Sequence, residues 1–227
     1  MVKGSKFDFN NIADSYDQWY SHPVTMKIDE FEKNAISTLL PSPESHPGVL
    51  EVGSGTGHWT KWLVNNGYSV TGIDISESMI RSASEKNLDN TRFIQGDFME
   101  TDFNEQFDIT IAITSLEFIP DYRKAIHKMA LLTRPGGVII TGVLNSFSYM
   151  GLVRRLKGDK DLVFGNAHFF SWFELKKILS TEGEATLKGS TFMLPYRWAI
   201  PFSSYCEAIG KNLFPVFGNF IAGRCQV

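Results

Sequence analysis

Three glycines spaced two residues apart form the part of the sequence best suited to ligand chemistry. Gly53, Gly55 and Gly57 lie between an apolar, strand-like segment at 48–52 and a helix-like segment at 59–66. Glycine lets a ligand approach the backbone closely, and free N–H groups at the start of a helix favour an anionic group. A tight strand-to-helix turn without a ligand has the same pattern, so other residues must decide the interpretation.

Acidic residues accompany the glycines at the ends of neighbouring predicted strands. Glu51 comes two residues before the first glycine, Asp74 ends the next strand, and Asp97 with Phe98 follows the third. The Asp74 carboxylate can accept hydrogen bonds from both hydroxyls of a ribose, and Asp97 and Phe98 offer an acceptor and an aromatic face for an adenine. Because the carboxyl ends of parallel strands meet in one crevice, these residues predict a site for a nucleoside-containing cofactor.

The spacing of the glycines separates two classes of cofactor. A dinucleotide fingerprint needs G-x-G-x-x-G, but His58 stands where the third glycine belongs and the run is instead G-x-G-x-G. S-adenosylmethionine has no pyrophosphate; its sulfonium and amino group suit the nearby Glu51, and its carboxylate can face the helix N-terminus. The sequence therefore favours S-adenosylmethionine, with a nicotinamide-dependent oxidoreductase as the alternative.

The segments that must position these residues alternate between strand and helix patterns. Nearly continuous β-branched strands with amphipathic helices between them predict an α/β fold, a mostly parallel sheet covered on both faces. We expect strands at 48–52, 68–75, 91–95, 107–114 and 138–144, and helices at 26–40, 59–66, 120–132 and 171–179, with a further helix after Ser76. Pro120 fits a first helical turn, and Ser171 with Glu174 forms a capping box.

Several motifs in the same order resemble one known family. They are FNNIADSYD (9–17), LEVGSGTG (50–57), GIDIS (72–76), QGDF (95–98), FD (107–108), LEFIP (116–120), RPGG (134–137) and HFFS (168–171). Over roughly residues 7–185 the chain resembles the class I S-adenosylmethionine-dependent methyltransferases, especially the small-molecule branch that includes the ubiquinone and menaquinone biosynthesis enzymes. The resemblance implies a Rossmann-like, seven-stranded sheet whose last two strands come from 185–194 and 216–225.

The resemblance also implies a set of cofactor-binding residues. Glu51 and the three glycines would hold the methionine end, Asp74 the ribose, and Asp97 and Phe98 the adenine. The full set is Tyr16, Glu51, Gly53, Ser54, Gly55, Gly57, Asp74, Ile75, Met79, Asp97, Phe98, Ile113 and Thr114. The product would be S-adenosylhomocysteine.

The acceptor side carries a weaker pattern. Some relatives have a histidine at the position of Phe118, so no catalytic base follows from the resemblance there. Orientation of an activated donor can itself lower the barrier by about 7–11 kcal/mol, and a base is needed only for some acceptors. His168 is our candidate base, with a structural role beside Ser171 as its equal alternative. We expect a small-molecule acceptor, apolar or aromatic, and keep a non-catalytic S-adenosylmethionine-binding protein as a further alternative.

Three segments flank the cofactor motifs in this single domain of residues 1–227. Residues 1–40, with Tyr16 and Trp19, predict a helical flap, and residues 145–170 predict a lid-like insertion. The basic cluster from Arg154 to Lys160 favours a solvated face over an anionic substrate or a membrane surface. Residues 185–227 hold aromatic side chains that either wall an acceptor pocket or fill a core layer: Phe192, Tyr196, Trp198, Phe202, Tyr205, Phe214, Phe217 and Phe220.

Composition limits the class of protein. The 227 residues carry 22 Lys and Arg against 25 Asp and Glu, a net charge of -3, which disfavours a nucleic-acid partner. No apolar window approaches the length of a membrane span, and the first twenty residues lack a signal-peptide pattern. Cys206 and Cys225 suit a reducing compartment and lack the spacing of a metal site. We therefore expect a cytoplasmic monomer or homodimer without a metal.

Overall fold

A seven-stranded sheet in the order β3-β2-β1-β4-β5-β7-β6 forms the centre of the computed structural model, which describes residues 5–157 and 163–227. The strands are β1 Gly48–Val52, β2 Ser69–Asp74, β3 Thr91–Gln95, β4 Phe107–Ile113, β5 Thr133–Leu144, β6 Glu184–Ser190 and β7 Phe220–Gln226. The first five strands are parallel, and β7 is antiparallel to both of its neighbours. The expected seven-stranded, mostly parallel α/β sheet is confirmed.

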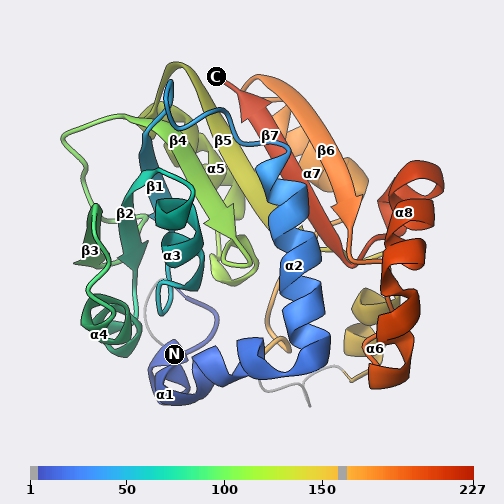
Figure 1. Cartoon of the computed structure of the whole chain (residues 1–227). Helices are drawn as coiled ribbons and strands as arrows, with labels where there is room; N and C mark the ends of the chain where they lie inside the picture. The colour runs from blue at the N-terminus through green and yellow to red at the C-terminus, as the bar shows by residue number, and fades with distance from the viewer. Residues whose placement is uncertain (1–4, 158–162) are drawn as a thin grey trace.

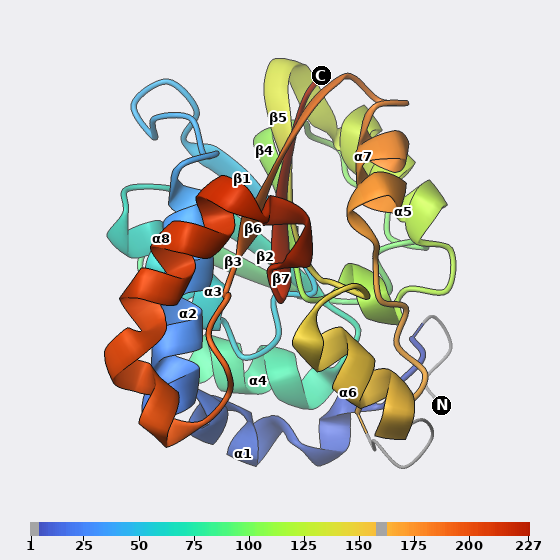
Figure 2. The same ribbon diagram turned by 90° about the vertical axis from the view of Figure 1, so that its right-hand side faces the viewer.

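Helices cover both faces of this sheet (Figures 1 and 2). The α-helices are α1 Ala13–Tyr16, α2 Pro23–Ser37, α3 His58–Asn65, α4 Glu77–Glu85, α5 Tyr122–Leu132, α6 Tyr149–Lys157, α7 Trp172–Leu179 and α8 Ser203–Leu213. Short 3₁₀ turns are η1 Phe9–Asn11, η2 Asp17–Ser21, η3 Leu116–Phe118, η5 Arg197–Phe202 and η6 Pro215–Phe217. No helix within the described residues is long and apolar enough to cross a membrane.

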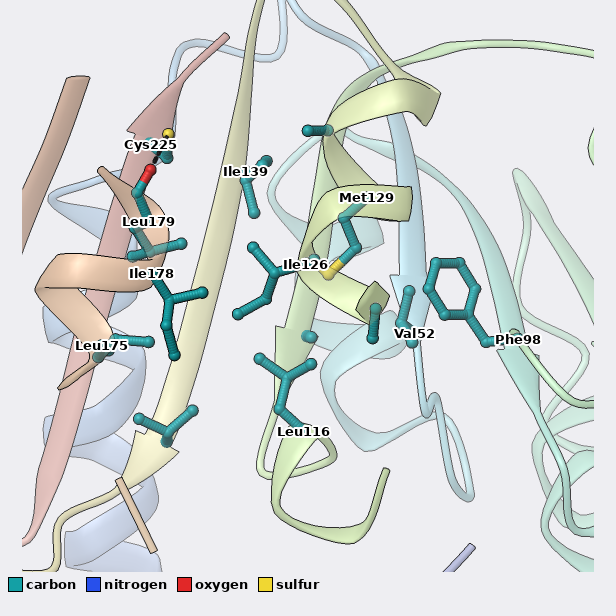
Figure 3. Close-up of a cluster of buried hydrophobic side chains, with 14 of the residues drawn as sticks. Val52, Phe98, Leu116, Ile126, Met129, Ile139, Leu175, Ile178, Leu179 and Cys225 are labelled. Carbon is teal, nitrogen blue, oxygen red and sulfur yellow. Dashed lines mark hydrogen bonds between the residues drawn. The ribbon is translucent and has the colours of Figure 1, made fainter. Parts of the chain in front are cut away.

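The two faces of the sheet hold separate hydrophobic layers, because successive side chains of a strand point to opposite faces. On β5, Ile139 and Val143 pack with α5 and α7 in one layer, shown in Figure 3. Val138 and Ile140 of the same strand pack in the other layer with residues of α2 and α3. The sheet is thus buried on both sides, and the polar ends of its strands are left to form the site.

Helix boundaries follow local capping chemistry. Ser76 accepts a hydrogen bond from the Met79 N–H group at 3.2 Å, and Ser171 accepts one from Glu174 at 3.1 Å. The expected start of α5 at Pro120 is wrong, because Asp121 caps that helix by accepting from the Lys124 N–H group. The start of α2 predicted at residue 26 is also wrong, because Pro23 occupies its first turn and the ring of His22 caps it.

The second half of the chain departs further from the prediction. β5 begins at Thr133 and not at residue 138 as predicted, because the Pro-Gly-Gly segment that precedes residue 138 belongs to the strand, across a register shift. Residues 145–170 include the helix α6, and β6 ends at Ser190, with α8 between it and β7. Lys160, which we grouped with the basic cluster, lies outside the described residues. Cys206 is exposed and Cys225 is buried, and both are free.

Candidate functional site

A cleft of about 690 Å³ lies at the carboxyl ends of β1, β2, β3 and β4. Most of the residues predicted to bind the cofactor line it: Tyr16, Gly53, Gly55, Asp74, Ile75, Met79, Asp97, Phe98, Ile113 and Thr114. They come from four strand ends, α1 and α4, and the parallel sheet brings them together as the crevice rule requires. Phe9, Phe118 and Ile119 complete the apolar part of the lining.

The glycine loop adopts a backbone that only glycine accepts readily. Gly53, Gly55 and Gly57 have φ angles of +75°, +53° and +79°. At Gly53 an added Cβ would lie 2.4 Å from the Cβ of Ser115, whereas at Gly55 it would meet nothing within 4 Å. Gly53 is therefore needed for packing, and the space beside Gly55 is left open for a ligand.

Asp74 holds this loop in place. Its Oδ2 accepts a hydrogen bond from the Gly55 N–H group at 2.9 Å, and its Oδ1 accepts one from Ser76 at 2.9 Å. Burial raises the pKa of Asp74, and hydrogen bonds from the backbone N–H groups of Ser76, Gly55 and Ile75 oppose that rise. Each oxygen still has acceptor capacity toward the cleft, as a ribose diol requires.

Three of the predicted residues do not line the cleft but support it from behind. Glu51 is buried on β1 and accepts a hydrogen bond from the Thr60 hydroxyl, and burial raises its pKa to about 8. Ser54 packs over Gly72, and its buried hydroxyl has no hydrogen-bond partner among the described residues. Gly57 lies against Ala83 and begins α3.

The far end of the cleft is apolar with a single carboxylate. Met79 and Phe98 are almost fully buried, and the Lys128 ammonium lies 5.3 Å from the centre of the Phe98 ring. Asp97 Oδ1 accepts a hydrogen bond from the Met99 N–H group at 2.8 Å, which fixes the carboxylate at the mouth of the cleft. This pairing of apolar walls with an acceptor suits an adenine.

The N-terminal segment is fastened over the cleft by hydrogen bonds. The Asn10 side chain accepts from the Ser76 hydroxyl at 2.8 Å, and the Asp17 carboxylate accepts from the Thr56 hydroxyl at 2.5 Å. Asp17 also pairs with Lys86 at 2.6 Å. These contacts tie η1 and η2 to α4 and to the glycine loop, and they place Tyr16 in the cleft wall.

A second, larger cavity of about 1320 Å³ adjoins the first. Four residues line both: Phe9, Tyr16, Thr114 and Phe118. The rest of the wall is mainly apolar and aromatic: Ile12, Trp19, Tyr20, Ile28, Trp59, Leu144, Met150, Val163, Phe164, Met193 and Pro195, with Glu32, Arg154, Thr191 and Asn219. Among these residues, sequence reasoning had placed Tyr16, Trp19, Thr114 and Phe118 near the site and had weighed a substrate role for Arg154; it did not identify the others.

Two buried carboxyl groups lie near this cavity. Glu32 of α2 lines it, and burial raises the pKa of Glu32 to about 8, with the negative Asp29 adding to the rise and Arg154 opposing it. Glu117 lies behind the wall and accepts a hydrogen bond from the Leu144 N–H group at 2.7 Å; burial raises its pKa to about 7. Sequence reasoning missed both acids: Glu32 lies in none of the motifs, and Glu117, although it belongs to the LEFIP motif, was assigned no role.

Other predicted site residues lie elsewhere. His168 lines neither cavity; its Nε2 is 3.1 Å from Glu174, and its ring stacks on Tyr122, so its contacts are those of a structural residue. The aromatic side chains that we singled out in residues 185–227 also line neither cavity. Phe220 is buried in the core and Phe192 is partly buried, whereas the others are exposed: Tyr196, Trp198, Phe202, Tyr205, Phe214 and Phe217. Both explanations that we offered for that group are wrong for most of its members.

Comparisons with known proteins agree with this geometry. A family profile described as a methyltransferase domain matches residues 49–137, the stretch that carries the glycine loop, Asp74, Asp97 and Thr114. A demethylmenaquinone methyltransferase of Staphylococcus aureus (strain JH9) is 37% identical over 142 residues, which are 58% of this chain and 56% of that enzyme. The chain thus spans only about half the length of this relative.

Two further proteins are similar over most of the chain. An uncharacterized protein of Methanocaldococcus jannaschii is 26% identical over 183 residues, 80% of this chain and 83% of that protein. A crystal structure of a SAM-dependent methyltransferase from Thermotoga maritima has a TM-score of 0.75 at 21% identity and covers 96% of this chain and 97% of that one. These comparisons do not support the oxidoreductase or the non-catalytic alternative.

Proposed function

The chain carries a class I S-adenosylmethionine-dependent methyltransferase domain, and from this premise we propose that it transfers the methyl group of S-adenosylmethionine to a small, largely apolar acceptor held in the second cavity. The observation that carries the proposal is the shared wall. Thr114, Tyr16, Phe9 and Phe118 line both spaces, so a donor in the first and an acceptor in the second would meet at these residues.

The cleft fits the cofactor. The open space at Gly55 would admit the methionine end, the Asp74 carboxylate would bind the ribose, and Met79, Phe98 and Asp97 would flank the adenine. Bound there, S-adenosylmethionine supplies a methyl group already activated by a sulfonium. The residues of this chain would bind it, hold it in register with the second cavity and exclude water.

Orientation is the main contribution that these residues can make. A methyl transfer is an in-line displacement, and correct placement of donor and acceptor contributes about 7–11 kcal/mol toward lowering the barrier. Aromatic side chains around the second cavity restrict the acceptor and keep it dry. Glu32 is the acidic group in this wall, and its carboxyl can take a proton or a hydrogen bond from an acceptor N–H or O–H group.

Two measurements on the full chain test the proposal. Isothermal titration calorimetry should show S-adenosylhomocysteine binding that is weakened in Asp74→Ala and unchanged in Glu32→Gln. A panel of phenols, amines and quinol-like compounds should then yield a labelled product from labelled S-adenosylmethionine, and Glu32→Gln should lower that yield. Failure of the wild-type chain to bind S-adenosylhomocysteine would overturn the proposal.

A further inference from the structure

A row of large apolar side chains lies on the outer side of α8. Phe202, Tyr205, Ile209 and Leu213 follow one another at intervals of three or four residues, so they project from one side of the helix. Their side chains are 56% to 73% exposed. Soluble proteins seldom expose a contiguous row of this kind unless the surface binds something.

The row continues onto η5 and α6. The rings of Tyr196 and Trp198 are stacked 6.0 Å apart, and the Tyr196 hydroxyl lies 3.1 Å from that of Tyr149 on α6. Leu152 and Leu156 lie one and two turns farther along α6 and are also exposed. Figures 1 and 2 show α8 and α6 on the same side of the molecule. We call this surface, made by α6, η5 and α8, the aromatic face.

Contacts on the inner side of α8 fix the direction of this face. The buried Glu207 carboxylate accepts hydrogen bonds from the Ser190 hydroxyl at 2.9 Å and from the backbone N–H groups of Thr191 and Phe192. Gly210 lies directly against the Phe192 ring, so no side chain larger than hydrogen fits there. Rotation of α8 to bury its apolar row would break these contacts.

The two described segments that form the aromatic face carry more cations than acidic side chains. Residues 185–227 contain one acidic residue, the buried Glu207, and residues 145–157 contain none. Exposed cations are present in both segments: Arg155, Arg197 and Lys211. The whole chain has a net charge of -3, so acidic residues outnumber basic ones in the rest of the sequence, which includes Asp159 and Asp161 beyond the described end of α6.

We propose that the aromatic face docks on an anionic lipid surface. Apolar side chains beside exposed cations form the pattern of an interfacial membrane-binding surface, and Trp and Tyr favour the headgroup level. A second copy of the chain fits less well, because a two-fold contact would set the same cations against one another.

The position of the second cavity agrees with this docking. Met150 and Arg154 come from α6, and Met193 and Pro195 come from the segment that leads into η5; all four line the cavity. An apolar molecule that leaves the lipid surface would therefore meet the same elements that wall the cavity. Docking itself does not depend on the proposed methyl transfer, since it can be measured without cofactor or acceptor.

Vesicle co-sedimentation of the full chain tests the proposal. Vesicles of phosphatidylcholine with phosphatidylglycerol should bind the chain, and vesicles of phosphatidylcholine alone should bind it much more weakly, with binding falling as salt rises. The double variant Phe202→Asp/Ile209→Asp should lower the partition onto anionic vesicles about tenfold or more. A matched control is Leu131→Asp/Phe173→Asp, which changes two side chains of similar exposure on α5 and α7 and should leave binding unchanged.

Three results would overturn the proposal. One is no binding of the wild-type chain to anionic vesicles, and another is equal binding to both compositions or an equal loss in both double variants. The third is a wild-type chain that does not bind vesicles but sediments as a dimer, with the double variant Phe202→Asp/Ile209→Asp sedimenting as a monomer. That result would identify a second copy of the chain as the partner. Far-ultraviolet circular dichroism and melting of both double variants establish that each is folded.

Discussion

The carboxylate of Asp74 accepts a hydrogen bond from the backbone N–H group of Gly55 at 2.9 Å. Through this bond the residue that ends β2 fixes the loop that follows β1, so the two strand ends form one binding surface. The same carboxylate accepts from Ser76 at the start of α4. A change at Asp74 therefore alters the loop geometry and, by our proposal, a contact with the cofactor.

Replacement of Asp74 by Asn should weaken S-adenosylhomocysteine binding. Hydrogen bonds to a charged group contribute about 1.5–3 kcal/mol each, so we expect a loss of affinity of about tenfold to a hundredfold by calorimetry. Asp102→Asn changes an exposed carboxylate outside the cleft and is the matched control. Equal affinities of Asp74→Asn and the wild type would contradict the assignment of Asp74 to the ribose.

Alanine at Gly53 should destabilise the fold more than alanine at Gly136. Both glycines have a positive φ, +75° and +83°, so both variants carry the strain of a left-handed backbone. Only at Gly53 does the new Cβ collide, 2.4 Å from the Cβ of Ser115. Overpacking costs about 1–3 kcal/mol, and urea unfolding should show that difference between the two variants. If Gly53→Ala were as stable as Gly136→Ala, the loop would be able to move away from Ser115 at no measurable cost, and the prediction would be contradicted.

The cofactor half of the site could be predicted from the sequence because its determinants are local. β-branched runs identify β1, β2 and β4, Ser76 identifies the start of α4, and the crevice rule then places Asp74 and Asp97 together. Glu51, which the prediction assigned to the cleft, instead accepts a hydrogen bond from Thr60 of α3 behind it. On a strand, a shift of one residue decides whether a side chain contacts the ligand or supports the site from behind.

The second cavity and the aromatic face could not be predicted in this way. Glu32, Phe164 and Met193 are far apart in the chain, and only the folded sheet places them around one space. The helical spacing of Phe202, Tyr205, Ile209 and Leu213 was present in the sequence, but the prediction placed strands at 185–194 and 216–225 and no helix between them. The contacts of Glu207 determine which side of α8 faces outward, and these contacts cannot be predicted from the spacing of residues in the sequence.

Buried carboxyl groups should make the fold less stable as pH rises. Burial holds the pKa of Glu51 at about 8 in the native state, whereas an unfolded glutamate titrates near its ordinary value of about 4.3. Between these values the native state keeps a proton that the unfolded state has lost, so raising the pH favours unfolding. Glu51→Gln removes this proton linkage and keeps a partner for Thr60.

Unfolding in urea at pH 5 and pH 8.5 measures this linkage. The wild-type free energy of unfolding should fall between the two pH values. The fall should be smaller in Glu51→Gln by up to about 4 kcal/mol, because the native state alone holds the proton from pH 5 to about 8 and each of these roughly three pH units contributes roughly 1.4 kcal/mol. Glu44→Gln changes an exposed glutamate and should follow the wild type. An equal fall in Glu51→Gln and the wild type would show that Glu51 is ionised in the native state.

Replacement of Glu32 by Gln should separate acceptor chemistry from cofactor binding. Glu32 lines the second cavity but not the first, so S-adenosylhomocysteine affinity should stay at the wild-type value. The pKa of Glu32 is about 8, so wild-type methyl transfer to an acceptor that must lose a proton should rise with pH until about 8, as the carboxylate forms. Glu32→Gln should remove this rise of the rate with pH and lower kcat by about 10²–10⁴. Glu30→Gln, on the exposed side of the same helix, should retain both the rate and its pH profile. An unchanged pH profile in Glu32→Gln would exclude Glu32 from proton transfer and leave orientation as the contribution of the cavity.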